Sequence, residues 1–226
     1  MVSSLVMKLD PNNFFDLEPF DHRAVFENGD QVWDALKHLK DYFSQVELGN
    51  IDAPIPESAV LVNPELISIG PGTVIEPGSF IQGPCVLGKG CFVRHGAYIR
   101  GFCLAGDECV IGHATEVKHA IFLNRAKAAH FAYVGDSILG NEVNLGAGTK
   151  CANLRFDHSE VYVNCDGERL PTGLKKLGAI FGDQSQTGCN AVTNPGTLFA
   201  KEASCYPCAN VGGVVLKSTK SFNTKV

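Results

Sequence analysis

Hydrophobic residues recur at every sixth position through the central part of the chain. One aliphatic series keeps a single phase from Ile69 onward: Ile69, Ile75, Ile81, Leu87, Val93, Ile99, Ala105, Ile111, Val117, Leu123, Ala129. A second series, made only of small residues, follows four positions behind: Thr73, Ser79, Cys85, Cys91, Ala97, Cys103, Cys109, Thr115. Glycine often stands one or three positions after the aliphatic residue, as Gly70 and Gly72 do.

A period of six fits neither an α-helix, which repeats every 3.6 residues, nor a strand with one buried face, which repeats every two. It fits a triangular coil in which each side holds one hexapeptide. The aliphatic residue then points inward, the small residue fits near a corner, and glycine supplies the turn conformations. The pattern therefore predicts an all-β fold, a left-handed parallel β-helix of hexapeptide repeats. Such a coil is an exception to the usual right-handed crossover.

The phase of the repeat breaks twice. After Ala129 the series restarts at Leu139, ten residues on instead of twelve, and it breaks again over about 153–177. The first break contains AKAAHFAYVGD (126–136), where Tyr133 stands at a position expected to be small. We predict a deformed corner there that displaces Tyr133 outward. A later series resumes the period: Phe181, Thr187, Thr193, Phe199, Cys205, Val211.

The remaining segments complete the predicted domain organisation. Residues 1–58 form an N-terminal extension, residues 59–214 the β-helix with a loop insertion at about 153–177, and residues 215–226 a C-terminal tail. A helix is expected over about 30–42, because apolar residues recur there at helical spacing and would pack against the rest of the protein. These residues are Trp33, Leu36, Leu39 and Phe43.

Composition and charge limit the kinds of function that this protein can have. A net charge of −5 gives no reason to expect nucleic-acid binding. The apolar runs are too short to span a membrane, and the N-terminus lacks the apolar core of a signal peptide, so we expect a cytoplasmic protein. Four of the nine cysteines occupy the small inward position and should be buried apolar residues. Cys205 and Cys208 form a CxxC without a second pair at zinc-site spacing, so no metal is expected.

Polar residues gather between Arg100 and Asn153. Arg100 and Lys118 each follow an inward residue and lie one full coil apart, so they should stack on one face, roughly 5 Å apart. Two stacked cations would favour an anion such as a phosphate, although solvated surface charges fit the same spacing. His130 also follows an inward residue, and a lone histidine can equally be structural.

Two longer motifs resemble a known family. EVKHAIFLNRAKAAHFAYVGDSILGNEVNLGAGTKCANLRFD (116–157) is similar to the acetyltransferase domain of bifunctional N-acetylglucosamine-1-phosphate uridyltransferase/glucosamine-1-phosphate acetyltransferases. TGLKKLGAIFGD (172–183) resembles the archaeal-type branch of that group. The resemblance covers about residues 96–183, and the uridyltransferase domain is expected to be missing from this chain.

The resemblance implies a role for each matching residue. His130 would be the general base that takes a proton from the attacking amine, and Asn153 would hold the acetyl carbonyl. Arg100 and Lys118 would bind a sugar phosphate, Tyr133 and Asn144 would orient the sugar, and Glu116 would meet its hydroxyls or Lys118. The backbone of Ala147 would contact the acetyl-CoA thioester arm, and Cys189 stands where the family has a small polar residue near that arm.

The same resemblance implies an activity and an assembly. The expected reaction is acetyl-CoA-dependent N-acetylation of an amino-sugar phosphate, glucosamine-1-phosphate in the first instance, for the synthesis of UDP-N-acetylglucosamine, a cell-envelope precursor. Family members are homotrimers with sites between subunits. Two alternatives stay open. One is an acyltransferase of the same fold that acts on a nucleotide-linked amino sugar. The other is a non-catalytic trimeric scaffold for a separate nucleotidyltransferase.

Overall fold

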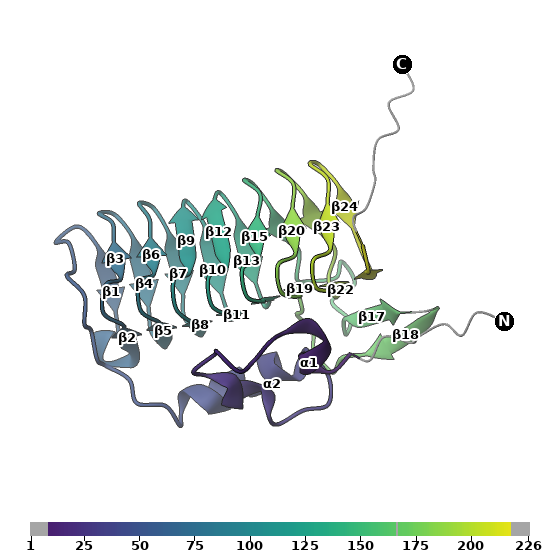
Figure 1. The fold of residues 1–226 in the computed structure, drawn as a ribbon, viewed down its shortest axis with the longest axis horizontal. Coiled ribbons are helices and arrows are strands. Elements are labelled where there is room, and N and C mark those ends of the chain that lie inside the picture. The colour runs from purple at the N-terminus through teal and green to yellow at the C-terminus, as the bar shows by residue number, and fades with distance from the viewer. Residues whose placement is uncertain (1–8, 166, 218–226) are drawn as a thin grey trace, which may run out of the picture.

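The chain winds into a long three-sided coil with a helical segment packed along one side (Figure 1). The computed structural model describes residues 9–165 and 167–217. The coil makes about 9 turns and is a left-handed parallel β-helix, as the hexapeptide period predicts. Among the described residues, no helix has the length and hydrophobicity of a membrane span.

Each side of the coil is a parallel sheet, and the chain passes through face 1, face 2 and face 3 in turn. Face 1 consists of β1 (Val60–Val62), β4 (Phe80–Gln82), β7 (Tyr98–Arg100), β10 (Glu116–Lys118), β13 (Tyr133–Gly135), β16 (Lys150–Cys151), β21 (Val192–Thr193) and β24 (Asn210–Val211). Face 2 consists of β2 (Ile67–Ile69), β5 (Cys85–Leu87), β8 (Cys103–Ala105), β11 (Ala120–Phe122), β14 (Ile138–Leu139), β19 (Ala179–Phe181), β22 (Thr197–Phe199) and β25 (Val214–Val215). Face 3 consists of β3 (Val74–Ile75), β6 (Phe92–Val93), β9 (Val110–His113), β12 (Lys127–His130), β15 (Asn144–Leu145), β20 (Gln186–Thr187) and β23 (Ser204–Cys205).

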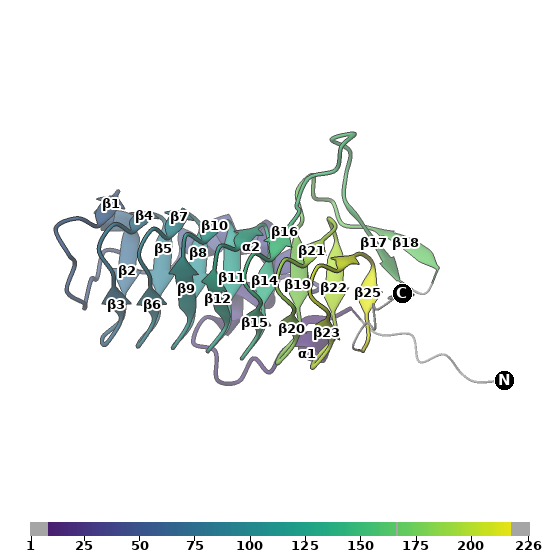
Figure 2. The same cartoon turned by 90° about the horizontal axis from the view of Figure 1, so that it is seen from above.

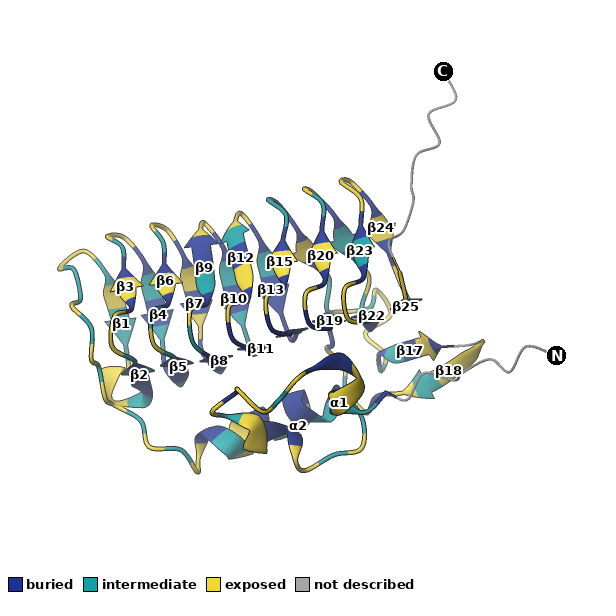
Figure 3. Ribbon diagram, in the orientation of Figure 1, coloured by how far each residue is buried: buried dark blue, intermediate teal, exposed yellow. Residues whose placement is uncertain are grey.

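The inward residues form one continuous apolar core along the axis (Figure 3). The cysteines predicted to be small and buried are so: Cys85, Cys91, Cys103 and Cys109 are at most 1% exposed and belong to this core. Later in the coil, Thr187 and Thr193 are also buried. The six-residue period is thus a consequence of stacking one side chain per face per turn.

The predicted phase is wrong at two positions. Val117 pairs with Ile99, 18 positions earlier, but Val134 pairs with Val117, only 17 positions later. The residues that fill the core are therefore Phe122 and Ala128, not Leu123 and Ala129. Likewise Ala132, not Tyr133, fills the small buried position before β13. The six-residue period continues in the sequence through Leu123 and Ala129 because each of them is apolar and stands next to the true core residue, Phe122 or Ala128.

The two steps that are five positions long instead of six both cross the corner between faces 1 and 2. Between β7 and β8 the corner holds two residues, Gly101 and Phe102, and the step between the inward residues Ile99 and Ala105 is six positions. His119 alone joins β10 to β11, so the step from Val117 to Phe122 is five positions rather than six. The step from Val134 to Leu139 is shortened in the same way at Asp136. His119 and Asp136 adopt positive φ angles of 47° and 50° to make these turns.

The N-terminal segment covers face 2. It contains α1 (Pro11–Phe14), the 3₁₀ turn η1 (Arg23–Phe26) and α2 (Asp34–Phe43); a second 3₁₀ turn, η2 (Pro64–Leu66), lies in the first coil. A second apolar cluster joins Trp33, Leu36 and Leu39 to outward residues of face 2 such as Leu104 and Ile121. The apolar stripe of the helix therefore packs, as its spacing predicts. Leu123 belongs to this cluster, which explains why it is apolar although it does not face the axis.

Polar side chains at the corner between faces 2 and 3 fasten this segment to the coil. Asn124 donates through Nδ2 to the carbonyl of Pro19 at 2.8 Å, and Asn141 donates to the carbonyl of Asp16 at 2.8 Å. The Asp183 carboxylate accepts from the backbone N–H groups of Asp16 at 2.6 Å and Asn141 at 2.7 Å. Burial raises the pKa of Asp183, against the effect of these donors.

The insertion in the coil carries a two-stranded hairpin of β17 (Tyr162–Cys165) and β18 (Glu168–Pro171). It leaves face 1 after β16 and returns to face 2 at β19, so it extends the same corner that is shortened at His119 and Asp136 (Figure 2). At the other end the coil continues through β25 to Val215. The tail expected over 215–226 lies outside the described residues from position 218 onward.

One glycine controls the approach of two coils next to His130. Gly112 on β9 lies under Ala129, and a Cβ atom there would overlap the Ala129 backbone. We expect Gly112→Ala to lower the free energy of unfolding by about 1–3 kcal/mol, the usual cost of overpacking. Gly212→Ala is the matched control, because its Cβ would meet its nearest neighbour, Asn194 Nδ2, at an ordinary 3.4 Å. Urea denaturation of both variants measures the difference, and equal stability would contradict the close approach.

Candidate functional site

Five of the predicted site residues gather on face 1 and at its corner with face 2. Arg100 ends β7 and Lys118 ends β10, and the register of these strands stacks the two side chains on the outer surface. Glu116 and Tyr133 begin neighbouring strands and pair directly with each other. Asn153 follows β16, where the insertion leaves the coil.

Both stacked cations already have carboxylate partners. Arg100 donates to Glu116 at 2.7 Å, and this pair is open to solvent, with side-chain exposures of 42% and 35%. The hydrogen bond raises the pKa of Arg100. Lys118 donates instead to both oxygens of Asp136, at 2.9 and 3.2 Å. The partner of Glu116 is therefore Arg100 rather than Lys118, and the two cations offer an anion less net charge than their spacing suggests.

Asp136 lies at the centre of this group. Its side chain is 8% exposed and accepts from Lys118 Nζ at 2.9 Å and from Asn153 Nδ2 at 2.6 Å, while His119 Nδ1 lies 3.1 Å from its Oδ1 atom. Burial opposes ionisation of Asp136, but the contacts with His119 and Lys118 outweigh it and hold the pKa of its carboxyl below the ordinary value. The carboxylate is therefore charged and fully engaged at neutral pH.

Asn153 connects this carboxylate to Tyr133. Its Nδ2 also lies 3.2 Å from the Tyr133 hydroxyl. Because an amide nitrogen carries two hydrogens, both are directed at partners within the chain. Burial raises the pKa of Tyr133, so its hydroxyl keeps its proton. Face 1 thus presents Tyr133, Lys118 and Arg100 from three successive coils.

The other predicted residues lie along the corner between faces 3 and 1 and on face 3. His130, Ala147 and Cys189 each stand two positions after an inward residue of face 3, and these inward residues pair in register. They form one column, in which Gly148 donates to the His130 carbonyl at 2.9 Å and Asn190 to the Ala147 carbonyl at 2.7 Å. Asn144 lies apart, on the exposed surface of face 3.

The column continues from His130 toward the N-terminal coils as a row of imidazoles. His95 and His113 stack with ring centroids 5.7 Å apart, and each bonds through Nδ1 to a carbonyl of the preceding coil. His130 pairs with His113 along the strands. Among the described residues, no hydrogen bond restrains the exposed His130 imidazole, whose ring centroid lies 6.2 Å from that of Phe131. Its position suits a group that exchanges a proton with a ligand.

Sequence reasoning missed Asp136 and His119. Asp136 stands in the quoted stretch 126–136, and His119 directly follows Lys118. The signal that could have found them is the pair of five-residue steps, because a shortened corner turns the residue at its apex toward its neighbours. Recognising those steps required knowing that Phe122 and Ala128, rather than Leu123 and Ala129, face the axis.

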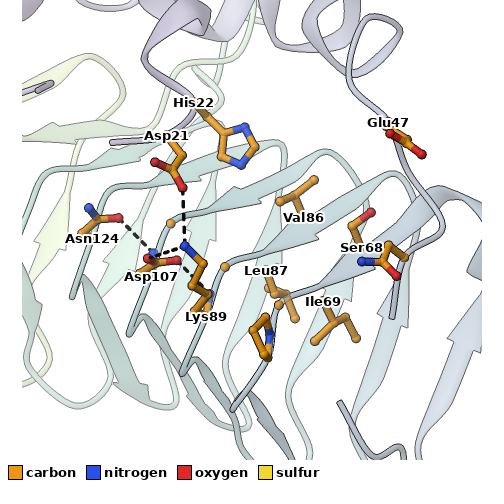
Figure 4. A pocket seen from close by; sticks show the side chains of 15 residues that line it. Asp21, His22, Glu47, Ser68, Ile69, Val86, Leu87, Lys89, Asp107 and Asn124 are labelled. Carbon is orange, nitrogen blue, oxygen red and sulfur yellow. Dashed lines mark hydrogen bonds and ion pairs between the residues drawn. The ribbon is translucent and has the colours of Figure 1, made fainter. Parts of the chain in front are cut away.

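A separate cavity of about 360 Å³ lies between the N-terminal segment and the first coils (Figure 4). Lys89 lies 3.9 Å from both Asp21 and Asp107 in its wall. None of the predicted site residues lines it. Within residues 9–165 and 167–217, no group of three or more His, Cys, Asp or Glu side chains is arranged to hold a metal ion.

Comparison with known proteins bears on these coils. A family model described as bacterial transferase hexapeptide (six repeats) matches residues 67–101. Over 98 residues the chain is 45% identical to a bifunctional sugar-1-phosphate nucleotidylyltransferase/acetyltransferase of Sulfurisphaera tokodaii, a match that covers 43% of this chain and 24% of that protein. Over 83 residues it is 43% identical to the bifunctional protein GlmU of Methanocaldococcus jannaschii, covering 37% and 20%.

Two further similarities are longer but weaker. The Escherichia coli acetyltransferase YaiX, itself uncharacterized, is 34% identical over 141 residues, covering 62% of this chain and 61% of YaiX. The crystal structure of an Arabidopsis UDP-N-acetylglucosamine acyltransferase aligns at a TM-score of 0.45 with 14% identity, covering 74% of this chain and 68% of that one. The chain spans a quarter or less of the two bifunctional relatives. Residues 67–101 are thus similar to bacterial transferase hexapeptide repeats, and about two fifths of the chain is similar to bifunctional sugar-1-phosphate nucleotidylyltransferase/acetyltransferase and GlmU proteins.

Proposed function

We propose that this protein is an acyltransferase that moves the acetyl group of acetyl-CoA to the amine of an amino-sugar phosphate, with glucosamine-1-phosphate as the first acceptor to test. The observation that carries the proposal is that two groups of residues meet where β12 is followed by β13. The column at the corner between faces 3 and 1, which contains Ala147 and Cys189, includes His130 there. The outer surface of face 1, which carries Arg100 and Lys118, reaches the same place at Tyr133. The Sulfurisphaera tokodaii relative, whose name includes an acetyltransferase, supports the same function.

The corner column suits the donor. Ala147 stands next to His130 along the column, and among the described residues its N–H donates no hydrogen bond. A backbone donor left open beside a base can hold the carbonyl oxygen of a thioester as it becomes negative. Cys189, the next member, is exposed and small enough to let a pantetheine arm pass. The donor would therefore lie along the column toward the C-terminal coils.

Face 1 suits the acceptor. The Arg100–Glu116 pair is half exposed and can open, so Arg100 would bind the phosphate and Glu116 a sugar hydroxyl. Lys118 carries a third ammonium hydrogen that its two bonds to Asp136 leave available. Tyr133 would contact the sugar ring. Asn144 on face 3 would reach the same acceptor only from a neighbouring chain, which supports a homotrimer with sites between subunits.

The chemistry balances with these groups alone. The neutral amine attacks the thioester carbonyl while His130 takes the proton that the nitrogen loses. The resulting oxyanion is held by the Ala147 N–H, and Asn153 would meet it from a neighbouring chain, because within one chain the two residues lie at opposite corners of face 1. Collapse breaks the carbon–sulfur bond, and His130 returns the proton to the leaving thiolate. The products are the N-acetyl sugar phosphate and free CoA, with no cysteine nucleophile and no metal step required.

The role of His130 is tested by thiol release from acetyl-CoA with glucosamine-1-phosphate. We expect His130→Ala to lower kcat by roughly two to four orders of magnitude, the usual scale for loss of a general base. His95→Ala is the matched control from the same column. An active wild type with an unchanged His130 variant would remove His130 as the base. Acetyl-CoA binding without turnover would indicate another acceptor, such as a nucleotide-linked amino sugar, and neither binding nor turnover would favour a scaffold.

The role of Arg100 is tested by its KM for the acceptor. We expect Arg100→Met to raise KM for glucosamine-1-phosphate about 10-fold or more, because a charge-assisted phosphate contact is lost, while KM for acetyl-CoA stays within twofold. Arg125→Met is the control, since Arg125 makes an equally exposed pair with Glu142 at 2.8 Å on the corner between faces 2 and 3. Equal effects of both substitutions on KM would contradict a phosphate site at Arg100.

A further inference from the structure

We propose that Asp136 is the positioning residue of this site: its carboxylate fixes Lys118 directly and Tyr133 through Asn153, and so sets the geometry in which the acceptor is held. The inference rests on the proposed function for its kinetic consequence. The arrangement of side chains that it describes can be tested without any substrate.

The contacts converge on one group. Lys118 and Asn153 approach Asp136 from β10 and from the start of the insertion, at 2.9 and 2.6 Å, and His119 closes a third side at 3.1 Å. These residues belong to three successive coils. Asn153 also donates through Nδ2 to the Tyr133 hydroxyl at 3.2 Å, so the position of Asn153 limits that of Tyr133. One carboxylate therefore ties together side chains that the β-ladders alone would leave in separate rotamers.

The backbone explains why the carboxylate can do this. Asp136 occupies a left-handed turn with φ of 50°, which aspartate and asparagine tolerate better than most residues. The step across this corner, from Val134 to Leu139, is five positions instead of six, and the Asp136 side chain lies beside Lys118 at the end of β10 with 8% exposure. Its neighbour Gly135 has no room for a side chain, because a Cβ would meet the Tyr133 hydroxyl at 2.6 Å. The close packing of Tyr133, Asn153 and Asp136 depends on that space.

Burial separates this pair from the other cation on face 1. The side chains of Lys118 and Asp136 are 24% and 8% exposed, against 42% and 35% for Arg100 and Glu116. An exposed pair contributes little and exchanges partners readily, whereas a buried pair is held because separating it leaves an uncompensated charge. Arg100 is thus the mobile cation and Lys118 the fixed one. Asp136 itself is too covered to reach a substrate, which is why it acts through other residues.

The first experiment compares lysine reactivity in wild type, Asp136→Asn and the control Asp183→Asn. Asparagine keeps the shape of the turn but removes the negative charge and leaves one acceptor oxygen in place of two. Each protein is treated with a limiting amine-reactive ester, and modification is quantified by peptide mass spectrometry. We expect labelling of Lys118 to rise about 10-fold relative to the exposed Lys127 in Asp136→Asn only, because a charge-assisted hydrogen bond has been lost. An unchanged ratio, or the same rise in Asp183→Asn, overturns the proposal.

The second experiment measures kinetics with acetyl-CoA and glucosamine-1-phosphate. We expect Asp136→Asn to lower kcat about 10- to 100-fold, the scale of a misplaced binding group, and Asp183→Asn to leave kcat within twofold even if it lowers the melting temperature. Equal losses in both variants would assign Asp136 a merely structural role. A wild type that neither binds acetyl-CoA nor turns over refutes the proposed function, and the labelling result then decides the positioning claim by itself.

A second variant covers the case in which Asp136→Asn alone does not fold. Combining it with Lys118→Gln removes the unpaired buried charge. Because Asp136 also positions Asn153 and Tyr133, we expect the double variant to lose about 10-fold more in kcat than Lys118→Gln alone. Equal kcat values for the double and the single variant overturn the link from Asp136 to Tyr133.

Discussion

The stacking of one inward side chain per face in every turn is the constraint on which the rest of the structure depends. Each turn of a parallel coil pairs only with the turns before and after it, so its register is kept by the ladders and by the fit of each inward side chain on the one below. The core runs from Ile67 to Val215 without interruption. Any residue removed from a turn must be removed at a corner, because removal within a strand would reverse every side chain beyond it. The site arises where two residues have been removed in this way.

The two shortened corners convert a repetitive scaffold into a specific site. His119 and Asp136 stand at the two shortened corners, and their side chains lie in one polar cluster with Lys118 and Asn153. The insertion leaves the coil one turn later at the same corner, which brings Asn153 to the cluster. A coil of uniform 18-residue turns would carry Arg100 and Lys118 equally well but would have no buried carboxylate to hold either.

The sequence predicted the architecture almost completely and the site only in part. Period, core cysteines and the packing face of α2 follow from hydrophobic spacing, since burial is the dominant favourable term in folding. The errors at Leu123 and Ala129 share one cause. Each is apolar and stands next to the true core residue, so hydrophobicity alone could not separate the axis of the coil from the surface under the N-terminal segment. Contacts between side chains were harder still to predict from the sequence. The pairing of Glu116 with Arg100 depends on the rotamers of two side chains on neighbouring strands, and residue spacing does not specify rotamers.

The N-terminal segment determines which surfaces remain for association. By covering face 2 with Leu36, Leu39 and Trp33 it leaves faces 1 and 3 open, and these faces keep large exposed hydrophobic residues: Val60 and Tyr98 on face 1, and Val74 and Phe92 on face 3, all more than 40% exposed. The same two faces carry the residues proposed to bind the acceptor, Arg100, Lys118 and Tyr133 on face 1 and Asn144 on face 3. Side-by-side packing of coils through these faces would bury that apolar surface, whereas face 2 is already covered. The helical segment therefore directs any such packing toward the faces that carry the proposed site.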